Sequence, residues 1–388
     1  MSTNPYTLLN PGRVHAGAGS LAQLAELAGF FGARRVLVVS DKGVAAAGLV
    51  DAPCRALEAA GIRVTLIDST PPEPEVRDVE AILESAHAAG SFDLVVGIGG
   101  GSAMDVAKIV AVLLAHPVSL RELLGRKAEI PARGLPTIMV PTTAGTGSEA
   151  TPNSIILVPE DALKVGIVSA KLMPDAVILD PLLTLTLPAA VTASTGMDAL
   201  THAIECYCSR KANPFSDLYG LEAIRLISRS IRRAVSDGRD VAAREDMLTG
   251  AYWGGVCIAT SSTTAVHALA YPLGGKYRVP HGLSNAILLP SVMAFNLEGS
   301  ERRFAAMARA MGLDVDGMDD AAAGAAFVQA LRELNADLGI PSSLRELGIR
   351  EEDLDGLVDG AAKVTRLLDN NPRPMSRDDM RALYAALL

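Results

Sequence analysis

The first half of the chain alternates short apolar runs with longer amphipathic ones. Short runs rich in β-branched residues, each followed by a helical pattern, indicate parallel strands joined by crossover helices. The expected strands fall at 35–40, 63–68 and 93–99, and the expected helices near 43–60, near 76–89 and from about 102. This pattern predicts an α/β domain built on a parallel sheet.

The pattern changes in the second half, where apolar residues recur every three to four positions and strand-like runs fade. This period is typical of amphipathic helices. The expected helices cover 190–209, 214–236, 241–271, 281–298, 300–312, 319–338, 351–367 and 376–387. We therefore predict an α/β nucleotide-binding domain at 1–185 and an all-α domain at 186–388.

Composition narrows the class of protein. With 388 residues, 49% of them hydrophobic and 20% charged, the chain is long enough to bury the cores of two domains. A net charge of -9 disfavours nucleic acid or an anionic membrane as partner, so small-molecule chemistry is favoured. The amino terminus lacks a basic segment followed by an apolar stretch, and no later run reaches membrane-spanning length. We therefore expect a cytoplasmic enzyme with no membrane or nucleic-acid partner.

Four side chains of the second half are grouped as a metal site requires. Asp198 and His202 are four residues apart in a helical run, so both project from one face. His267 lies in another helical run, and His281 opens a third after Pro280. A lone histidine on a helix is more often a hydrogen-bonded core residue, but this grouping favours metal ligation. Because none of the four is a thiolate, the set suits Fe(II), Zn(II), Mn(II), Ni(II) or Co(II), with room for a substrate carbonyl.

A glycine cluster ends the third strand of the first half. The strand runs into Gly99, Gly100 and Gly101, and the next helix begins at Ser102. Glycines allow the backbone to approach a ligand closely, and the free amides at a helix start favour an anion. A pyrophosphate is therefore the expected ligand. Asp105 in the first helical turn complements the dipole and is a further candidate cofactor-binding residue. The alternative is a tight turn with no ligand.

Two further segments could line the same cofactor groove. A hydroxyl-rich loop at 141–149 follows an apolar strand, and Asp41 follows the strand at 35–40. A carboxylate at the end of such a strand is placed to accept hydrogen bonds from a ribose diol, and its charge would repel a 2′-phosphate. NAD is therefore expected in preference to NADP. Asp41 could equally be an ordinary helix cap.

Several motifs in order resemble one known family. GGGSAMDVAK at 99–108, PTTAGTGSEAT at 141–151, TGMDALTHAIE at 195–205, VHALAYPLGGKYRVPHGLSNAILLP at 266–290 and NNPRPMSRDDM at 370–380 are similar to motifs of the iron-containing, or group III, alcohol dehydrogenases, which have a dehydroquinate synthase-like fold. The resemblance implies that Asp198, His202, His267 and His281 hold a metal, usually Fe(II). It places Asn153 near the nicotinamide and substrate. It also implies NAD(P) contacts at Asp41, Gly100, Gly101, Ser102, Thr142, Thr143, Thr146 and Lys164.

The chain departs from the family in two places. Many members carry a second histidine four residues after the third ligand as a proton relay, and here that position holds Tyr271. A phenol near a cation can have a lowered pKa, but its ordinary value near 10 suits neutral pH less well than imidazole, and a purely structural Tyr271 is the alternative. The second departure is the hydroxyl-rich stretch at 257–264. It suits a polar or anionic substrate, unless the hydroxyls bond to the backbone.

The sequence hypothesis is a metal-dependent, NAD(H)-linked alcohol dehydrogenase or aldehyde reductase. Its active site is expected in the cleft between the domains, and its small substrate binds through oxygen to the cation. The alternatives are a maleylacetate reductase-like enzyme, a polyol dehydrogenase, a lyase of the dehydroquinate synthase type, or a protein that senses NAD without turnover. A homodimer or larger homo-oligomer is expected from the family.

Overall fold

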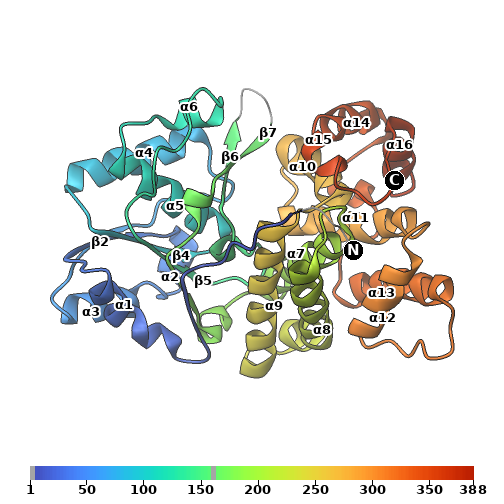
Figure 1. Cartoon of the computed structure of the whole chain (residues 1–388), viewed down its shortest axis with the longest axis horizontal. Coiled ribbons are helices and arrows are strands. Elements are labelled where there is room, and N and C mark those ends of the chain that lie inside the picture. The colour runs from blue at the N-terminus through green and yellow to red at the C-terminus, as the bar shows by residue number, and fades with distance from the viewer. Residues whose placement is uncertain (1–4, 159–162) are drawn as a thin grey trace. The chain divides into compact units, whose positions relative to one another are not determined.

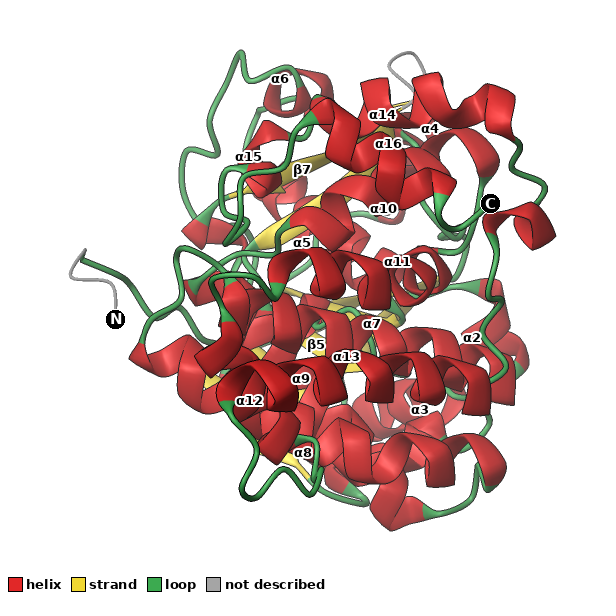
Figure 2. Cartoon of the chain, turned by 90° about the vertical axis from the view of Figure 1, so that its right-hand side faces the viewer, coloured by secondary structure: helices red, strands yellow, loops and turns green. Residues whose placement is uncertain are grey.

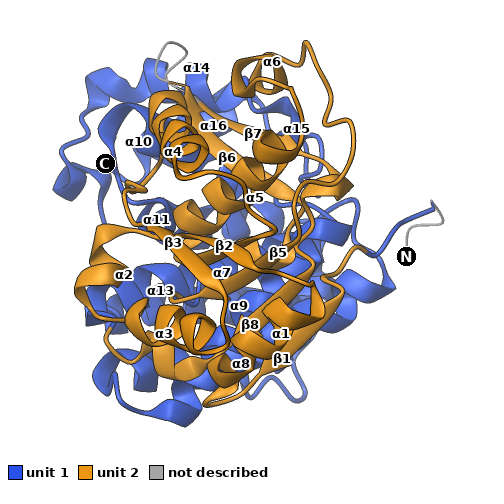
Figure 3. Cartoon of the chain, turned by 90° about the vertical axis from the view of Figure 1, so that its left-hand side faces the viewer, with its two compact units in different colours: residues 1–8, 144–146, 187–388 blue, residues 9–143, 147–186 orange. Residues whose placement is uncertain are grey.

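The computed structural model describes residues 5–158 and 163–388, and these form two compact units (Figure 3). One unit, here called the nucleotide unit, comprises Leu9–Thr143 and Gly147–Thr186. The other, here called the helical unit, comprises Leu187–Leu388, the short loop Ala144–Thr146 and the first residues of the chain up to Leu8. The predicted division into two consecutive segments therefore differs from these units in two places, the amino-terminal segment and the loop at 144–146.

The nucleotide unit is built on a six-stranded sheet with the order β1-β8-β5-β4-β2-β3. Three of its strands, β2, β4 and β5, are labelled in Figure 1. Every neighbouring pair of strands in this sheet is parallel. The fold class predicted from the alternating pattern is confirmed. The strands are β1 (Arg13–Ala16), β2 (Arg35–Val39), β3 (Arg63–Ile67), β4 (Leu94–Gly99), β5 (Thr137–Pro141) and β8 (Ala176–Leu179).

The four inner strands β2, β4, β5 and β8 are buried on both faces, which explains why they are almost continuously apolar. Val36 and Val38 of β2 belong to one core, together with Leu94 and Val96 of β4. Helices α1 (Leu24–Phe30) and α3 (Asp51–Ala59) contribute Leu24 and Leu57 to it. The residues between them point to the opposite face, because side chains alternate along a strand. Helix α5 packs against β4, β5 and β2.

The three helices expected in the nucleotide unit are present, and one of them needs a correction. The expected helix at 43–60 is in fact two helices, since the chain turns at Gly48, whose φ of 74° is a left-handed conformation that suits glycine. The helices are α1 (Leu24–Phe30), α2 (Lys42–Ala46), α3 (Asp51–Ala59), α4 (Val76–Ala89), α5 (Gly101–Ala115) and α6 (Leu120–Leu124). The sequence pattern did not predict α1, α6, β1, β8 or an antiparallel hairpin of β6 (Asn153–Val158) and β7 (Leu163–Val168).

The helical unit consists of packed helices, with α7 in contact with α8, α9 and α11 (Figure 2). The predicted helix at 241–271 is divided into α9 and α10, because the chain leaves helical geometry at Ser261 and restarts at Ala265. The predicted helix at 351–367 is also divided. The elements are α7 (Ala189–Cys208), α8 (Pro214–Ser236), α9 (Val241–Thr260), α10 (Ala265–Tyr277), α11 (His281–Asn296), α12 (Glu301–Ala310), α13 (Asp320–Asp337), α14 (Leu354–Ala362), α15 (Thr365–Leu368) and α16 (Arg377–Ala385).

Among the described residues, no helix is both long and apolar enough to cross a membrane.

Candidate metal centre and cofactor residues

Helix α7 supplies two of the four predicted metal ligands. Asp198 and His202 lie one turn apart on it, and both are buried, at 2% and 5% exposure. Burying a carboxylate or an imidazole costs folding free energy unless the group has a hydrogen-bonding, ionic or metal partner. Both side chains are therefore expected to have such a partner inside the unit. The helix therefore presents both predicted ligands to the interior from one face.

The other two predicted ligands come from the starts of α10 and α11. His267 lies in the first turn of α10, and His281 is the first residue of α11. Gly282 lets α11 approach α7 this closely: a Cβ added to it would lie 2.3 Å from the carbonyl oxygen of Ser194 and 3.3 Å from the Cβ of Asp198. A side chain at position 282 would push His281 away from Asp198.

The structure brings the four side chains together. One ligand atom from each of Asp198, His202, His267 and His281 lies within 4.8 Å of all the others. The Nε2 atoms of His202, His267 and His281 lie 3.8, 3.9 and 3.7 Å from Oδ1 of Asp198. Ligands held at about 2.0–2.2 Å from a tetrahedral cation are separated by roughly 3–4 Å, so the donor set fits a divalent metal ion.

The charges within this cluster depend on one another. Burial by itself would raise the pKa of Asp198, but the three histidines and the amide of Asn285 lower it below its usual value. Burial lowers the pKa of His202 and so favours the neutral ring, the form that binds a metal. The His281 side chain is the most accessible of the four, at 29% exposure, so the cluster is most open on its side.

Two residues that the sequence analysis did not assign complete the surroundings of the cluster. The carboxylate of Glu205 contacts Nδ1 of His267, and the amide nitrogen of Asn285 lies 2.7 Å from Oδ1 of Asp198. Both are fully buried. Helical spacing was the available signal, because Glu205 lies three residues after His202 and Asn285 four after His281.

In the nucleotide unit, Asp41 and Gly99 meet at the point where the strand order reverses. From β2 the chain runs to β3 on one side and then to β4 on the other, and ligands of open α/β sheets bind at the carboxyl ends of such strands. Asp41 follows β2 and caps α2 by accepting the amide of Val44 at 2.9 Å. A Cβ on Gly99 would lie 3.1 Å from Oδ2 of Asp41 and 2.8 Å from the Cβ of Ala103.

The remaining residues of the predicted nucleotide loops are linked to each other. The amide of Thr142 donates to the carbonyl of Gly99 at 2.9 Å, and a Cβ on Gly100 would lie 3.6 Å from Thr143. Gly101 and Ser102 begin α5.

Glu73 connects two of the predicted cofactor residues. Its amide donates to Oγ of Ser102 at 3.2 Å, and its carboxylate pairs with Nζ of Lys164 at 2.6 Å. Ser102 and Lys164, far apart in the sequence, are thus linked by one residue.

Asp105 has internal partners instead of an open face. It is buried and accepts hydrogen bonds from the Ser148 hydroxyl and, at 2.9 Å, from the amide of Ile155. Nζ of Lys108 lies 3.0 Å away. Because α5 begins at Gly101, Asp105 lies beyond its first turn, and the predicted contribution to the helix dipole was wrong. Asp105 instead ties α5 to the loop at 141–151 and to β6.

Three further predicted residues lie on other elements. Asn153 is the first residue of β6, opposite Val168 of β7. Thr146 lies in the loop that belongs to the helical unit. The Tyr271 ring centroid lies 6.4 Å from that of His281, so the residue borders the cluster. Burial raises the pKa of Tyr271, as do the charges of Glu205 and Asp198, while Arg366 lowers it, and the net direction is upward.

The hydroxyl-rich stretch before His267 bonds largely to the protein itself. Thr260 donates to the carbonyl of Thr7 at 2.8 Å, Ser261 to the carbonyl of Cys206 at 3.1 Å, and Thr264 to Glu205 at 2.7 Å. These three hydroxyls are therefore not a free polar lining for a substrate, which was the alternative that the sequence left open.

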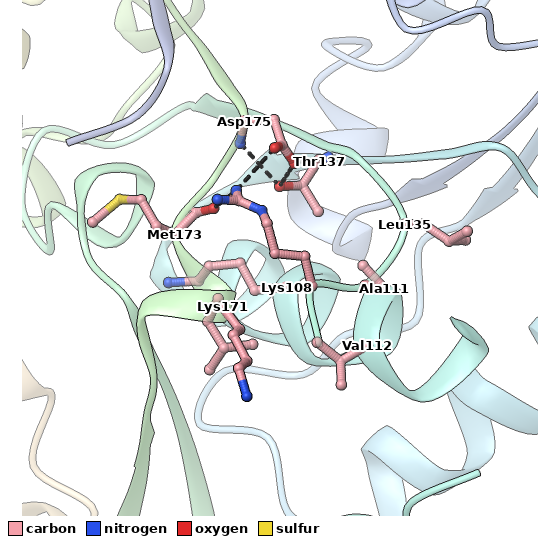
Figure 4. A pocket seen from close by; sticks show the side chains of 11 residues that line it. Lys108, Ala111, Val112, Leu135, Thr137, Lys171, Met173 and Asp175 are labelled. Carbon is pink, nitrogen blue, oxygen red and sulfur yellow. Dashed lines mark hydrogen bonds and ion pairs between the residues drawn. The ribbon is translucent and has the colours of Figure 1, made fainter. Parts of the chain in front are cut away.

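A small polar hollow in the nucleotide unit is closed by its own groups (Figure 4). Arg133 donates to Asp175 at 2.8 Å and to the carbonyl of Met173 at 2.6 Å, and Lys171 donates to the carbonyl of Pro131 at 3.1 Å. The cationic side chains that line the hollow are therefore already paired within the unit.

Comparison with known proteins agrees with this arrangement. The family described as iron-containing alcohol dehydrogenase matches residues 11–181, and the carboxyl-terminal model of the same family matches 192–388. A long-chain-alcohol dehydrogenase 1 of Geobacillus thermodenitrificans (strain NG80-2) is 41% identical over 96% of this chain and 94% of its own.

Solved structures share the fold. A 1,3-propanediol oxidoreductase superposes with a TM-score of 0.95 at 35% identity, covering 99% of this chain and 100% of that one. A sulfoacetaldehyde reductase from Bifidobacterium kashiwanohense, solved in complex with NAD+, has a TM-score of 0.88 at 29% identity and covers 99% of both chains. The protein is therefore an oxidoreductase that belongs to the iron-containing alcohol dehydrogenase family.

Proposed function

We propose that the protein is a metal-dependent, NAD(H)-linked alcohol dehydrogenase or aldehyde reductase acting on small alcohols or aldehydes. In this reaction a hydride passes between C4 of the nicotinamide and the substrate carbon that bears oxygen, and one proton leaves or joins that oxygen. The observation that carries the proposal is the buried cluster of Asp198, His202, His267 and His281, whose ligand atoms lie within 4.8 Å of one another.

The four ligands define the chemistry that a bound cation supplies. Fe(II) is the metal we propose, with Zn(II), Mn(II), Ni(II) or Co(II) as alternatives, and such a cation polarises the substrate oxygen as a Lewis acid. One carboxylate and three neutral imidazoles leave a net positive centre. His281, the most exposed ligand, marks the side on which a substrate can approach.

For the cofactor we propose NAD rather than NADP. Its pyrophosphate is assigned to the start of α5 at Gly99, Gly100, Gly101 and Ser102, and its ribose to Asp41. Thr142, Thr143, Thr146 and Lys164 are proposed as further cofactor contacts, and Asn153 as a residue near the nicotinamide. The meeting of Asp41 and Gly99 at the strand reversal supports this assignment.

Tyr271 is proposed as a proton relay. With its pKa raised, the phenol stays protonated at neutral pH and would act by donating its hydrogen bond rather than as a ready base. Tyr271→Phe removes only the hydroxyl, so a loss of kcat with unchanged metal content would support the relay. Unchanged kcat would assign Tyr271 a packing role.

The substrate class is proposed from what the relatives act on. Their names cover a long-chain alcohol, 1,3-propanediol and sulfoacetaldehyde, so the fold accommodates apolar, polar and anionic substrates. The internal hydrogen bonds of Thr260, Ser261 and Thr264 remove the main argument for a polar wall. The ratio of kcat/KM for hydroxylated or sulfonated aldehydes to that for long-chain aldehydes measures a polar or anionic preference.

The test is a metal analysis of anaerobically prepared protein, followed by NADH oxidation with a panel of long-chain, hydroxylated and sulfonated aldehydes. We expect one divalent cation per chain and turnover of at least one aldehyde. His267→Ala should lose metal and activity together. Metal-replete protein that turns over none of the panel would contradict the proposal, and tight NAD binding without turnover would instead favour a sensing role.

A homodimer or larger assembly and a cytoplasmic location are also proposed. The first can be tested by measuring the mass in solution, and the second by fractionating cells that make the protein.

A further inference from the structure

Glu205 is a charged side chain buried beside the metal cluster, and the ligand set does not account for it. It lies on α7 with 0% exposure. One carboxylate oxygen accepts the hydroxyl of Thr264 at 2.7 Å and the amide of Val266 at 2.7 Å. The other oxygen contacts Nδ1 of His267. A buried carboxylate with three partners at the start of α10 therefore joins two elements that carry metal ligands.

The chemistry of these partners determines where the proton of His267 lies. The Val266 amide can only donate, and the Thr264 hydroxyl donates with it, so Oε1 is fully used as an acceptor. The other oxygen, Oε2, has Nδ1 of His267 as its partner, and a carboxylate oxygen only accepts. Nδ1 of His267 must then carry the hydrogen.

A proton on Nδ1 leaves the lone pair of the neutral ring on Nε2. This is the atom that faces the cluster, 3.9 Å from Oδ1 of Asp198 and 3.1 Å from the amide nitrogen of Asn285. The ring is therefore held in the tautomer and the orientation that a metal ligand needs.

We infer that Glu205 is a positioning residue that fixes the Nδ1–H tautomer of His267 and so presents Nε2 to the cation. The inference rests on the proposed function for the presence of that cation. The competing explanation is purely structural: Glu205 accepts orphan donors at the start of α10 and would contribute only to folding. The two explanations differ in what removing the charge does to metal affinity.

Glu205→Gln is the informative substitution, because glutamine keeps the shape but has a single acceptor oxygen. If that oxygen stays with Val266 and Thr264, the amide NH₂ faces Nδ1 and forces the hydrogen of His267 onto Nε2. If the amide turns round, its NH₂ opposes the Val266 N–H. Outer-shell partners of this kind typically contribute 10–100-fold to metal affinity, so we expect a loss of about that size.

The matched control is Thr264→Val, which removes one hydrogen bond to Glu205 and leaves His267 untouched. Both variants should lower the unfolding temperature of the metal-free protein. Only Glu205→Gln should weaken binding of Zn(II) or Fe(II) in competition with a chelator. Equal metal affinity of Glu205→Gln and the unchanged protein would overturn the inference, and so would an equal loss in Thr264→Val.

A second measurement does not depend on the variant folding. The ¹⁵N shifts of the His267 ring, read in the unchanged protein with and without Zn(II), should show hydrogen on Nδ1 in both states. Hydrogen on Nε2 would overturn the inference. Failure of the unchanged protein to bind any divalent cation would contradict the proposed function separately, since the tautomer can still be read in the metal-free state.

Discussion

The amide nitrogen of Asn285 lies 2.7 Å from Oδ1 of Asp198, the oxygen around which the three histidine Nε2 atoms gather. The same nitrogen is 3.1 Å from Nε2 of His267 and 3.3 Å from Nε2 of His281. In the metal-bound protein the histidine Nε2 lone pairs would bind the cation and could no longer accept from Asn285. A carboxylate oxygen of Asp198, in contrast, can bind a metal and accept a hydrogen bond at the same time, in the metal-bound as in the metal-free protein. Asn285 is therefore the group that can keep Asp198 in place in both states.

Asn285→Ala should weaken metal binding about 10-fold or more, since the carboxylate of Asp198 loses its buried donor. Chelator competition measures the effect. Asn296→Ala is the control, because Asn296 is also a buried asparagine of α11 but pairs with Asn371. It should lower stability while leaving metal affinity as it was. Loss of affinity in both variants would show that damage to α11, not the contact to Asp198, is responsible.

Gly282→Ala should separate His281 from the other ligands. The added methyl would meet the carbonyl of Ser194 at 2.3 Å, and a contact with backbone cannot be relieved by a rotamer change. We expect lower metal content after purification and a destabilisation of roughly 1–3 kcal/mol in chemical unfolding. Gly356→Ala on α14 is the control, since its nearest atom is the end of Lys276 at 3.5 Å, and it should be neutral or slightly stabilising. A Gly282→Ala protein with full metal content would contradict this packing argument.

Asp41→Asn should relax the preference for NAD. Asparagine caps a helix as well as aspartate, so α2 keeps its start while the charge facing a 2′-phosphate is removed. The ratio of kcat/KM for NADP to that for NAD should rise about tenfold, because a charge pair near a protein surface contributes on the order of 1–4 kcal/mol. Asp319→Asn changes the cap of α13 in the same way and should leave the ratio alone. An unchanged ratio in Asp41→Asn would remove Asp41 from the ribose site.

The parts of the fold that could be predicted are those whose signals are local. The helix expected at 76–89 and that expected at 214–236 coincide with α4 and α8, and α8 begins with an Asn213 cap followed by Pro214. The break at Ser261 could not be predicted, because the Ser261 hydroxyl bonds to Cys206, a residue 55 positions away. Edge strands such as β1 were missed because four residues carry too little periodicity.

The same distinction applies to the candidate site. Asp198 and His202 were predicted from a spacing within one helix. The contact of Glu205 with His267 joins residues 62 positions apart, and that of Asn285 with Asp198 joins residues 87 apart. The sequence shows which side chains share a helix face, but it does not show which faces meet. The surroundings of the ligands therefore had to come from the structure.

Glu149 should make stability depend on pH in a direction opposite to that of most carboxylates. It is 1% exposed, and its Oε2 has no hydrogen-bond partner among the described residues. Burial raises the pKa of Glu149 to about 7, the charge of Asp105 adds to the rise, and its own backbone and Lys108 oppose it. The folded state therefore holds its proton more tightly than the unfolded chain, whose ordinary value is 4.5.

Below about pH 4.5 Glu149 is protonated in both the folded and the unfolded state, and its contribution to stability is fully present. As pH rises towards about 7 the unfolded chain releases the proton first, and the folded state becomes less stable by about 3 kcal/mol. Other carboxylates, such as Asp198, change stability with pH in the opposite sense. The quantity to measure is therefore the difference in unfolding free energy between the unchanged protein and Glu149→Gln at each pH. Glu149→Gln removes the titration and keeps the neutral shape. Compared by urea unfolding between pH 4.5 and 8, the unchanged protein should lose stability relative to Glu149→Gln. Parallel curves would show that the carboxylate is solvated or paired in solution.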